Sequence, residues 1–277
     1  MLIVLAFQRL RIQLLSTTLD GSAATFWERL TERGECSPRF QRRGSMISTP
    51  TGNKLLDGLA AQDLQRLRPH LEEVAFIQKQ TLNAPGALIE DIYFPTAGVV
   101  SLIASLGDGT AVEVGVIGPE GMVGTPALLG SETASNEAFV QVNGNGLRMP
   151  TTVLLDAADQ SSDLRRRLLR FAQALSFQIS QSAACNARHV VEERCARWLL
   201  AAHDRVGGDG LMLTHEFLGV MLGVRRAGVT VAAGSLQRAG LIRYRQGRVT
   251  ILDREALEAA ACECYRITTD EYDRLLA

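Results

Sequence analysis

The stretch from residue 213 to residue 252 constrains the fold more than any other part of the chain. It reads LTHEFLGVMLGVRRAGVTVAAGSLQRAGLIRYRQGRVTIL. Thr214 is suited to cap a first helix, in which apolar residues recur at helical spacing. Gly223 follows at the point where a chain leaving a helix needs a positive φ at little steric cost. A second helix is predicted from about Val224, and Gly240 ends it.

Two short strands are predicted after this second helix, over residues 241–244 and 249–252, with an RQGR turn between them. Gly219, Gly223 and Val229 have the spacing expected of two helices that cross closely at a sharp turn. The pattern therefore predicts a helix-turn-helix, and the hairpin makes it a winged version. The alternative is an ordinary three-helix core with solvated arginines.

The charge on this stretch favours nucleic acid as a partner. Residues 214–250 contain six arginines and one acid, Glu216, which leaves a net charge of +5. Arg225 and Arg226 lie at the start of the second helix, where such a helix meets base edges and phosphates. The wing arginines can hold neighbouring phosphates. The candidate DNA-binding residues are Thr214, His215, Arg225, Arg226, Thr230, Arg243, Arg245 and Arg248.

Residues 71–150 have a different composition and a different period. They carry nine acids and two bases, a net charge of −7, so this part would be repelled by DNA. Short apolar alternations separated by turn residues predict a small antiparallel roll or barrel. We expect a hairpin turn at the GDG of residues 107–109 and another at the NGNG of residues 143–146. The expected strands are residues 72–78, 90–94, 97–105, 111–117, 137–142 and 146–149.

Helices are predicted on both sides of the roll. A short helix or helix pair is expected over residues 53–69, and a short helix follows the roll at Thr151. A long helix over residues 162–187 carries an apolar row at near-heptad spacing, which we interpret as a seam between two chains rather than a face packed on the chain's own roll. This candidate dimer interface consists of Leu164, Leu168, Phe171, Leu175 and Ile179. Two further helices are predicted over residues 190–205 and 254–265.

The predicted fold class is α+β, with an N-terminal antiparallel β-roll (jelly-roll-like), a long dimerisation helix and a C-terminal winged helix-turn-helix. The expected domains are a disordered extension (1–52), the roll that receives a signal (53–160), the dimerisation helix (161–187) and the DNA-binding domain (188–277). The apolar run at the N-terminus is too short and interrupted for a membrane span, so no membrane partner is expected. Whether residues 1–45 belong to the natural product is left open, because Met46 is an alternative start.

The five cysteines form no paired framework, which favours a reducing, cytoplasmic location. Cys262-x-Cys264 is the one close pair. A metal ion or cluster would need further ligands nearby in the sequence, and none is evident, so we expect these two residues to be packed or solvent-facing thiols. The sequence therefore predicts no metal site and no cofactor.

The order of roll, long helix and winged helix-turn-helix makes the chain similar to the Crp/Fnr family of bacterial transcription regulators. The resemblance covers residues 53–265, and its most specific part is the stretch at 213–252; the roll segment IYFPTAGVVSLIASLGDGTAVEVGVIGPEGMVG and the long helix carry the rest. It implies a homodimer that binds near-palindromic double-stranded DNA through the major groove, with RNA polymerase as a further partner. It also implies that Thr214 contacts a phosphate and that Arg226 reads a base.

The chain departs from the family pattern in its base-reading residues and in the effector pocket of its roll. The best-known member has a glutamate at the position of Ala227 and a second base-reading arginine at that of Val231. The operator sequence which that member recognises should therefore not be the one that this chain recognises. A cyclic-nucleotide pocket in this fold needs an arginine for the cyclic phosphate, and residues 71–147 contain none. An iron–sulfur sensor would need several N-terminal cysteines, and only Cys36 is there. The effector, operator, target genes and sign of regulation stay open.

Two other classes of function compete with this interpretation. A cupin-type enzyme would need histidines in the roll, and residues 71–150 contain none, so we expect no enzymatic activity. The winged helix could instead serve a protein-interaction or small-molecule-sensing module that does not bind DNA. Salt dependence distinguishes these, because binding through several phosphates falls steeply with added salt.

Overall fold

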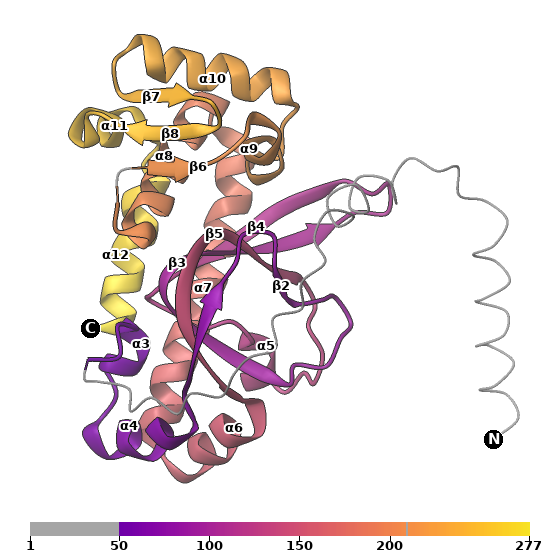
Figure 1. Cartoon of the computed structure of the whole chain (residues 1–277), viewed down its shortest axis with the longest axis vertical. Coiled ribbons are helices and arrows are strands. Elements are labelled where there is room, and N and C mark those ends of the chain that lie inside the picture. The colour runs from indigo at the N-terminus through magenta and orange to yellow at the C-terminus, as the bar shows by residue number, and fades with distance from the viewer. Residues whose placement is uncertain (1–49, 209) are drawn as a thin grey trace, which may run out of the picture. The chain divides into compact units, whose positions relative to one another are not determined.

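The computed structural model describes residues 50–208 and 210–277 (Figure 1). Most of the predicted N-terminal extension, residues 1–49, therefore lies outside the described residues. Thr51 is buried, and its hydroxyl donates a hydrogen bond to the Asp57 carboxylate at 2.7 Å. Packing thus begins slightly before Asn53, the position from which regular structure was expected.

The helix pair before the roll forms as predicted. Helix α3 (Lys54–Asp57) is capped by the side chain of Asn53, and α4 (Ala61–Leu67) leads into the 3₁₀ turn η1 (Arg68–His70), which contains Pro69. The Asn53 amide also donates to the Pro95 carbonyl at 2.8 Å and to the Gly121 carbonyl at 2.9 Å. One buried side chain therefore ties this segment to two parts of the roll.

The roll is a five-stranded antiparallel sheet, as the alternating pattern predicted. Its strand order is β1-β5-β3-β4, with β2 also paired to β5. Two pairs of predicted strands are each one long strand, because the chain bends through bulges without leaving the sheet. The strands are β1 (Glu72–Phe76), β2 (Thr81–Asn83), β3 (Asp91–Ser105), β4 (Ala111–Ile117) and β5 (Glu137–Pro150).

The predicted hairpin turn at residues 143–146 is wrong. These residues lie inside β5, where Gly144 pairs with Phe76 and Asn145 with Ala97. The glycines allow the backbones of neighbouring strands to approach closely, because a Cβ at Gly144 would lie 2.0 Å from the Ala97 carbonyl oxygen. The turn at residues 107–109 is correct, since β3 and β4 pair on either side of it.

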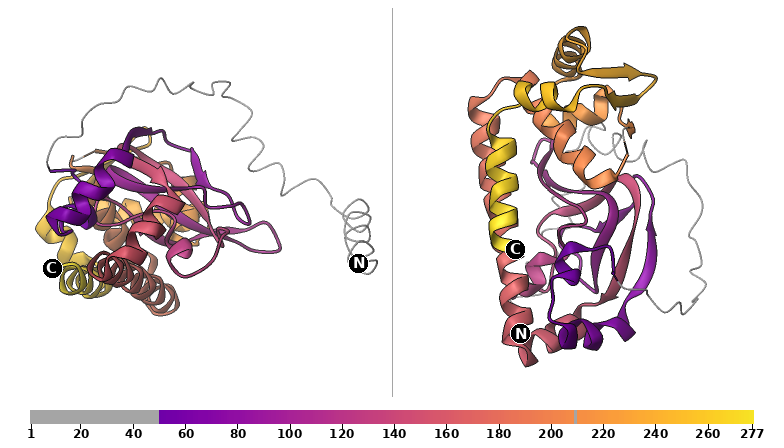
Figure 2. Two further views of the ribbon diagram at one scale, coloured as in Figure 1. Left: turned by 90° about the horizontal axis from the view of Figure 1, so that it is seen from below. Right: turned by 90° about the vertical axis from the view of Figure 1, so that its left-hand side faces the viewer.

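Three helices cover the roll after β4. Helix α5 (Thr125–Leu128) was not predicted, whereas α6 (Thr151–Gln160) and the long α7 (Ser162–Arg188) agree with the sequence pattern. Buried apolar side chains of α6 and α7 join those of the roll in one core. Figure 2 shows the long α7 beside the strands.

The row of residues assigned to a dimer seam packs on the chain's own roll instead. Leu164, Leu168, Phe171 and Leu175 are all buried in the roll core, and Ile179 packs against it. The contact is tight, because a Cβ on Gly121 would lie 2.1 Å from the Phe171 ring. The seam assignment is thus corrected, because the chain itself buries this apolar row.

The C-terminal part contains the predicted winged helix-turn-helix with additions. The third strand, β6, pairs with the wing, and the sheet order is β6-β8-β7. The last predicted helix is in fact two helices, because Ala261 is extended and breaks it. The elements are α8 (Val191–Val206), β6 (Gly210–Met212), α9 (His215–Leu222), α10 (Arg226–Arg238), β7 (Ile242–Arg245), β8 (Arg248–Ile251), α11 (Arg254–Ala260) and α12 (Cys264–Leu276).

Helix α12 runs alongside α7 (Figure 2). The Tyr272 ring packs edge-on against Phe171, with centroids 6.5 Å apart, and its hydroxyl accepts a hydrogen bond from Gln178 at 3.2 Å. Among the described residues, no single helix is long and apolar enough to cross a bilayer; α9 and α10 reach that threshold only together, and they are bent by 101° at their junction.

The corrected packing of α7 makes a first prediction. Replacing Leu168 with glutamate places a carboxylate in the roll core and should lower the free energy of unfolding by about 3 kcal/mol or more. Chemical denaturation measures the loss. Leu129→Glu is the matched control, since Leu129 is 66% exposed and the same substitution there should cost less than about 0.5 kcal/mol. A stable Leu168→Glu protein that only changes from dimer to monomer would restore the seam assignment.

Candidate nucleic-acid interface

The helix-turn-helix is built as its sequence predicts. The Thr214 side chain caps α9 by accepting from the Phe217 amide at 3.1 Å, and Gly223 ends the helix in the left-handed region with φ 60°. The two helices meet at 101°. Gly219 allows this approach, because a Cβ there would lie 2.9 Å from the Val224 carbonyl oxygen.

Helix α10 has one buried and one exposed face. It begins at Arg226, with Arg225 as its N-cap, slightly later than predicted. Val229, Ala232, Ala233 and Leu236 are buried, as expected. The opposite face, called here the recognition face, consists of the exposed residues Arg226, Ala227, Thr230 and Val231.

The wing presents the remaining arginines. Strands β7 and β8 are joined by Gln246 and Gly247, both with positive φ (52° and 75°), which gives a tight hairpin. The predicted wing arginines are all exposed, and residues 226–250 contain no acid to neutralise them. These three residues are Arg243, Arg245 and Arg248.

A hollow of about 440 Å³ lies between the recognition face and the wing. Thr214, His215, Arg226 and Thr230 line it, so the structure brings half of the predicted residues together; the other four arginines are exposed outside its lining. Gln237 and Tyr244 also line it. Neither residue was among those predicted from the sequence, although Tyr244, an aromatic residue between two wing arginines, was an available signal.

His215 contacts two other residues that line this hollow. Its Nδ1 lies 3.0 Å from the Thr230 hydroxyl, and its ring lies 4.5 Å from that of Tyr244. The Tyr244 hydroxyl donates to the Leu213 carbonyl at 2.7 Å. Partial burial and the nearby Arg226 lower the pKa of His215. The imidazole is therefore neutral near pH 7, and the positive charge of the surface comes from the arginines.

A buried acid joins the roll to the helix that precedes the helix-turn-helix. Glu113 on β4 accepts a hydrogen bond from the Trp198 indole of α8 at 2.7 Å, and its other carboxyl oxygen lies 2.6 Å from the Ser101 hydroxyl. Burial raises the pKa of Glu113 to about 7, against the opposing effect of these hydrogen bonds. The Ser101 hydroxyl also contacts the side-chain amide of Gln141.

Two more contacts link the roll to the helices of the C-terminal part. Arg205 of α8 forms an ion pair with Glu120 of the roll at 2.8 Å, with both side chains largely buried. The Phe139 ring of β5 packs on Phe217 of α9, with centroids 5.8 Å apart. The helix-turn-helix is thus coupled to the roll through packed and hydrogen-bonded side chains.

Several solved structures share this fold. FixK2 from Bradyrhizobium japonicum is 17% identical, with a TM-score of 0.60 over 69% of this chain and 98% of its own. Two regulators from Thermus thermophilus, one of the CRP family and one of the CRP/FNR family, are 22% and 26% identical, with TM-scores of 0.55 and 0.50. They align over 68% and 69% of this chain and 96% and 98% of their own. No curated protein matches the chain by sequence.

Two family models match consecutive parts of the chain. The model of the cyclic nucleotide-binding domain matches residues 73–161, and that of the Crp-like helix-turn-helix domain matches residues 193–260. The chain belongs to the Crp/Fnr family of transcriptional regulators. The expected family and fold class are thereby confirmed. In the roll of this Crp/Fnr protein, Arg148, the one arginine of residues 71–150, forms ion pairs with Glu72 and Asp91.

Glu113 makes the stability of the fold depend on pH. Its ordinary pKa of 4.5 rises to about 7 on folding, so the folded state binds more protons between these values. The contribution of Glu113 to the free energy of unfolding should be greatest below pH 4.5. It should fall by about 3 kcal/mol as the pH rises to 7. Urea denaturation of Glu113→Gln should show that this decline has gone. Glu132→Gln, at an exposed position, should retain the parent's decline; a Glu113→Gln profile equal to the parent's would contradict the assignment.

Proposed function

We propose that this chain is a sequence-specific DNA-binding transcription regulator that acts as a homodimer. The observation that carries the proposal is the exposed, arginine-rich surface formed by the recognition face and the wing on a helix-turn-helix. Residues 214–250 carry a net charge of +5. Such a surface complements the phosphate backbone of double-stranded DNA.

In this proposal α10 enters the major groove with its N-terminal end foremost. Arg226 donates to guanine, and Val231, which is 70% exposed, contacts the methyl group of thymine. Thr214, His215, Arg225 and Thr230 contact the backbone or nearby base edges, and the wing arginines hold the flanking phosphates. Ala227 and Val231 therefore give this regulator its own operator sequence.

The dimer is proposed to form through the face of α7 that points away from the roll. Exposed residues recur on that face at steps of four and three, which is the heptad spacing of a two-chain seam. Most are small, so two helices can approach closely. The Ser180 hydroxyl donates to the Ser176 carbonyl within the helix at 3.0 Å and needs no partner across the seam. The proposed seam is Leu169, Gln173, Ser176, Ser180, Ala183 and Ala187.

The roll is proposed to receive the signal, and the Glu113–Trp198 contact lies on the path to the helix-turn-helix. A cyclic nucleotide is disfavoured as effector, because residues 71–150 contain one arginine and two acids already pair with it. RNA polymerase stays a predicted partner.

Substitution of Arg226 tests base reading. Arg226→Ala should weaken binding to the selected operator by about 10- to 100-fold, equivalent to ~1–3 kcal/mol, and random DNA much less. Fluorescence anisotropy at several salt concentrations measures both affinities. Arg238→Ala, which removes a charge at the other end of α10, is the control and should leave the ratio of the two affinities unchanged. An equal loss on both DNAs would make Arg226 a phosphate contact, and no salt-dependent binding would exclude DNA as the partner.

Charge on the proposed seam tests the dimer. Ser176→Arg together with Ser180→Arg should give a folded monomer, because four arginines would face each other across the seam. Sedimentation and circular dichroism measure association and folding. Replacing the same two residues with alanine keeps the small side chains and should leave the dimer intact. A dimeric double-arginine variant would refute this seam.

A further inference from the structure

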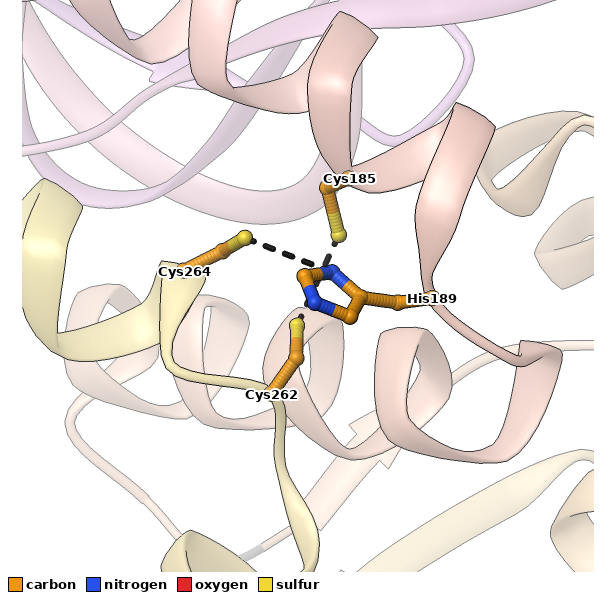
Figure 3. A group of neighbouring side chains, drawn as sticks. All are labelled: Cys185, His189, Cys262 and Cys264. Carbon is orange, nitrogen blue, oxygen red and sulfur yellow. Dashed lines mark hydrogen bonds between the residues drawn. The ribbon is translucent and has the colours of Figure 1, made fainter.

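Three cysteines and a histidine converge where α7, α8, α11 and α12 meet. Cys185 lies in the last turn of α7, and His189 follows that helix as its C-cap. Cys262 lies between α11 and α12, and Cys264 is the first residue of α12. One ligand atom from each residue lies within 4.8 Å of all the others, and Figure 3 shows the four side chains directed at one another.

The spacing of these atoms suits a single tetrahedral ion. Zinc binds thiolate sulfur at about 2.3 Å, which places ligand atoms of a tetrahedral site about 3.8 Å apart. The Cys185 and Cys262 sulfurs are 3.5 Å apart, and the Cys264 sulfur is 3.5 Å from His189 Nδ1. A disulfide would require about 2.05 Å between sulfurs. All four described cysteines are free thiols.

The surroundings orient the ligands in the way metal sites require. His189 turns Nδ1 toward the cysteines, while its Nε2 lies 3.2 Å from the Glu263 carboxylate. A carboxylate that accepts from the second ring nitrogen fixes the tautomer and orientation of a ligating histidine. The Gln181 amide donates to the Cys264 sulfur at 3.1 Å, which stabilises a thiolate there.

The site is enclosed, and positive charge lies beside it. The three cysteines are buried and form a cluster of their own that contains no aliphatic or aromatic side chain. Three thiolates around a divalent ion leave one negative charge. The guanidinium groups of Arg194 and Arg197 act electrostatically on Cys185, and both have a buried Nε without a hydrogen-bond partner among the described residues.

We propose that Cys185, His189, Cys262 and Cys264 bind one zinc ion in a closed tetrahedral site. Four protein ligands with three sulfurs are typical of a structural rather than a catalytic zinc. The ion would fasten the α11–α12 junction to the end of α7, and so hold the C-terminal helix α12 alongside α7. The proposal takes the place of the expectation of packed or solvent-facing thiols without a metal. The proposal does not depend on DNA binding, because none of the four ligands belongs to the recognition face or the wing.

Metal analysis of the full chain tests the site. Protein purified under reducing conditions without a metal-affinity step should contain about one zinc per chain. Replacement by cobalt should give the visible absorption of a tetrahedral thiolate complex, and X-ray absorption of the zinc form should fit three sulfurs and one nitrogen. All three measurements use the unaltered chain, so their results do not depend on whether a variant folds.

Substitutions distinguish the residues that bind the zinc ion from residues that only lie near it. Cys264→Ser should lose the cobalt–thiolate intensity of one ligand and weaken zinc binding in chelator competition. Glu263→Gln, at the surface and not a ligand, should lower zinc affinity by about 10- to 100-fold. Cys195→Ala is the control: Cys195 is buried in α8 outside the cluster, and its loss should leave the zinc content unchanged.

Several results would overturn the proposal. They are a reduced, folded chain that takes up neither zinc nor cobalt, a zinc affinity that is equal in the parent and in Cys264→Ser, and iron with inorganic sulfide in place of zinc. A disulfide between two of the three cysteines in the freshly purified protein, with no bound metal, would equally refute it.

Discussion

The packing of α7 on the roll is the interaction on which the rest of the structure depends. Leu164, Leu168 and Phe171 enter the roll core, and Gly121 leaves room for the Phe171 ring. This choice of face leaves small residues on the opposite side of the helix, where a second chain can approach. It also places the end of α7, with Cys185, beside the start of α12. One buried apolar row therefore determines where the proposed seam and the proposed zinc site lie.

The roll and the helix-turn-helix are joined by buried polar groups as well as by apolar packing. Burial raises the pKa of Glu113 to about 7 although its carboxyl group accepts a hydrogen bond from Trp198, and Arg205 pairs with Glu120 in a largely buried position. Such groups stabilise a fold less than apolar residues of the same size, and they specify one arrangement of the partners. In a Crp/Fnr regulator, contacts of this kind suit the path between a sensing domain and a DNA-binding domain.

Local signals in the sequence predicted most of the elements. Thr214 as a cap, Gly223 as a left-handed terminator and the alternation of β4 each act within a few residues, so their effect can be read without a partner. The prediction failed where one local pattern has two uses. Gly144 and Gly146 have the composition of a turn but serve backbone approach within β5, and the apolar row of α7 fits a two-chain seam as well as a long roll.

The sequence by itself determined the order of the domains, the helix-turn-helix and the separation of an acidic roll from a basic reading surface. These follow from periodicity, capping residues and charge, which are properties of neighbouring residues. Three features became known from the fold alone: the face of α7 that is buried, the contact between Glu113 and Trp198, and the meeting of Cys185 and His189 with Cys262 and Cys264. The two halves of that cluster are more than 70 residues apart in the chain. The spacing of neighbouring residues cannot predict that two such distant helix junctions will be in contact.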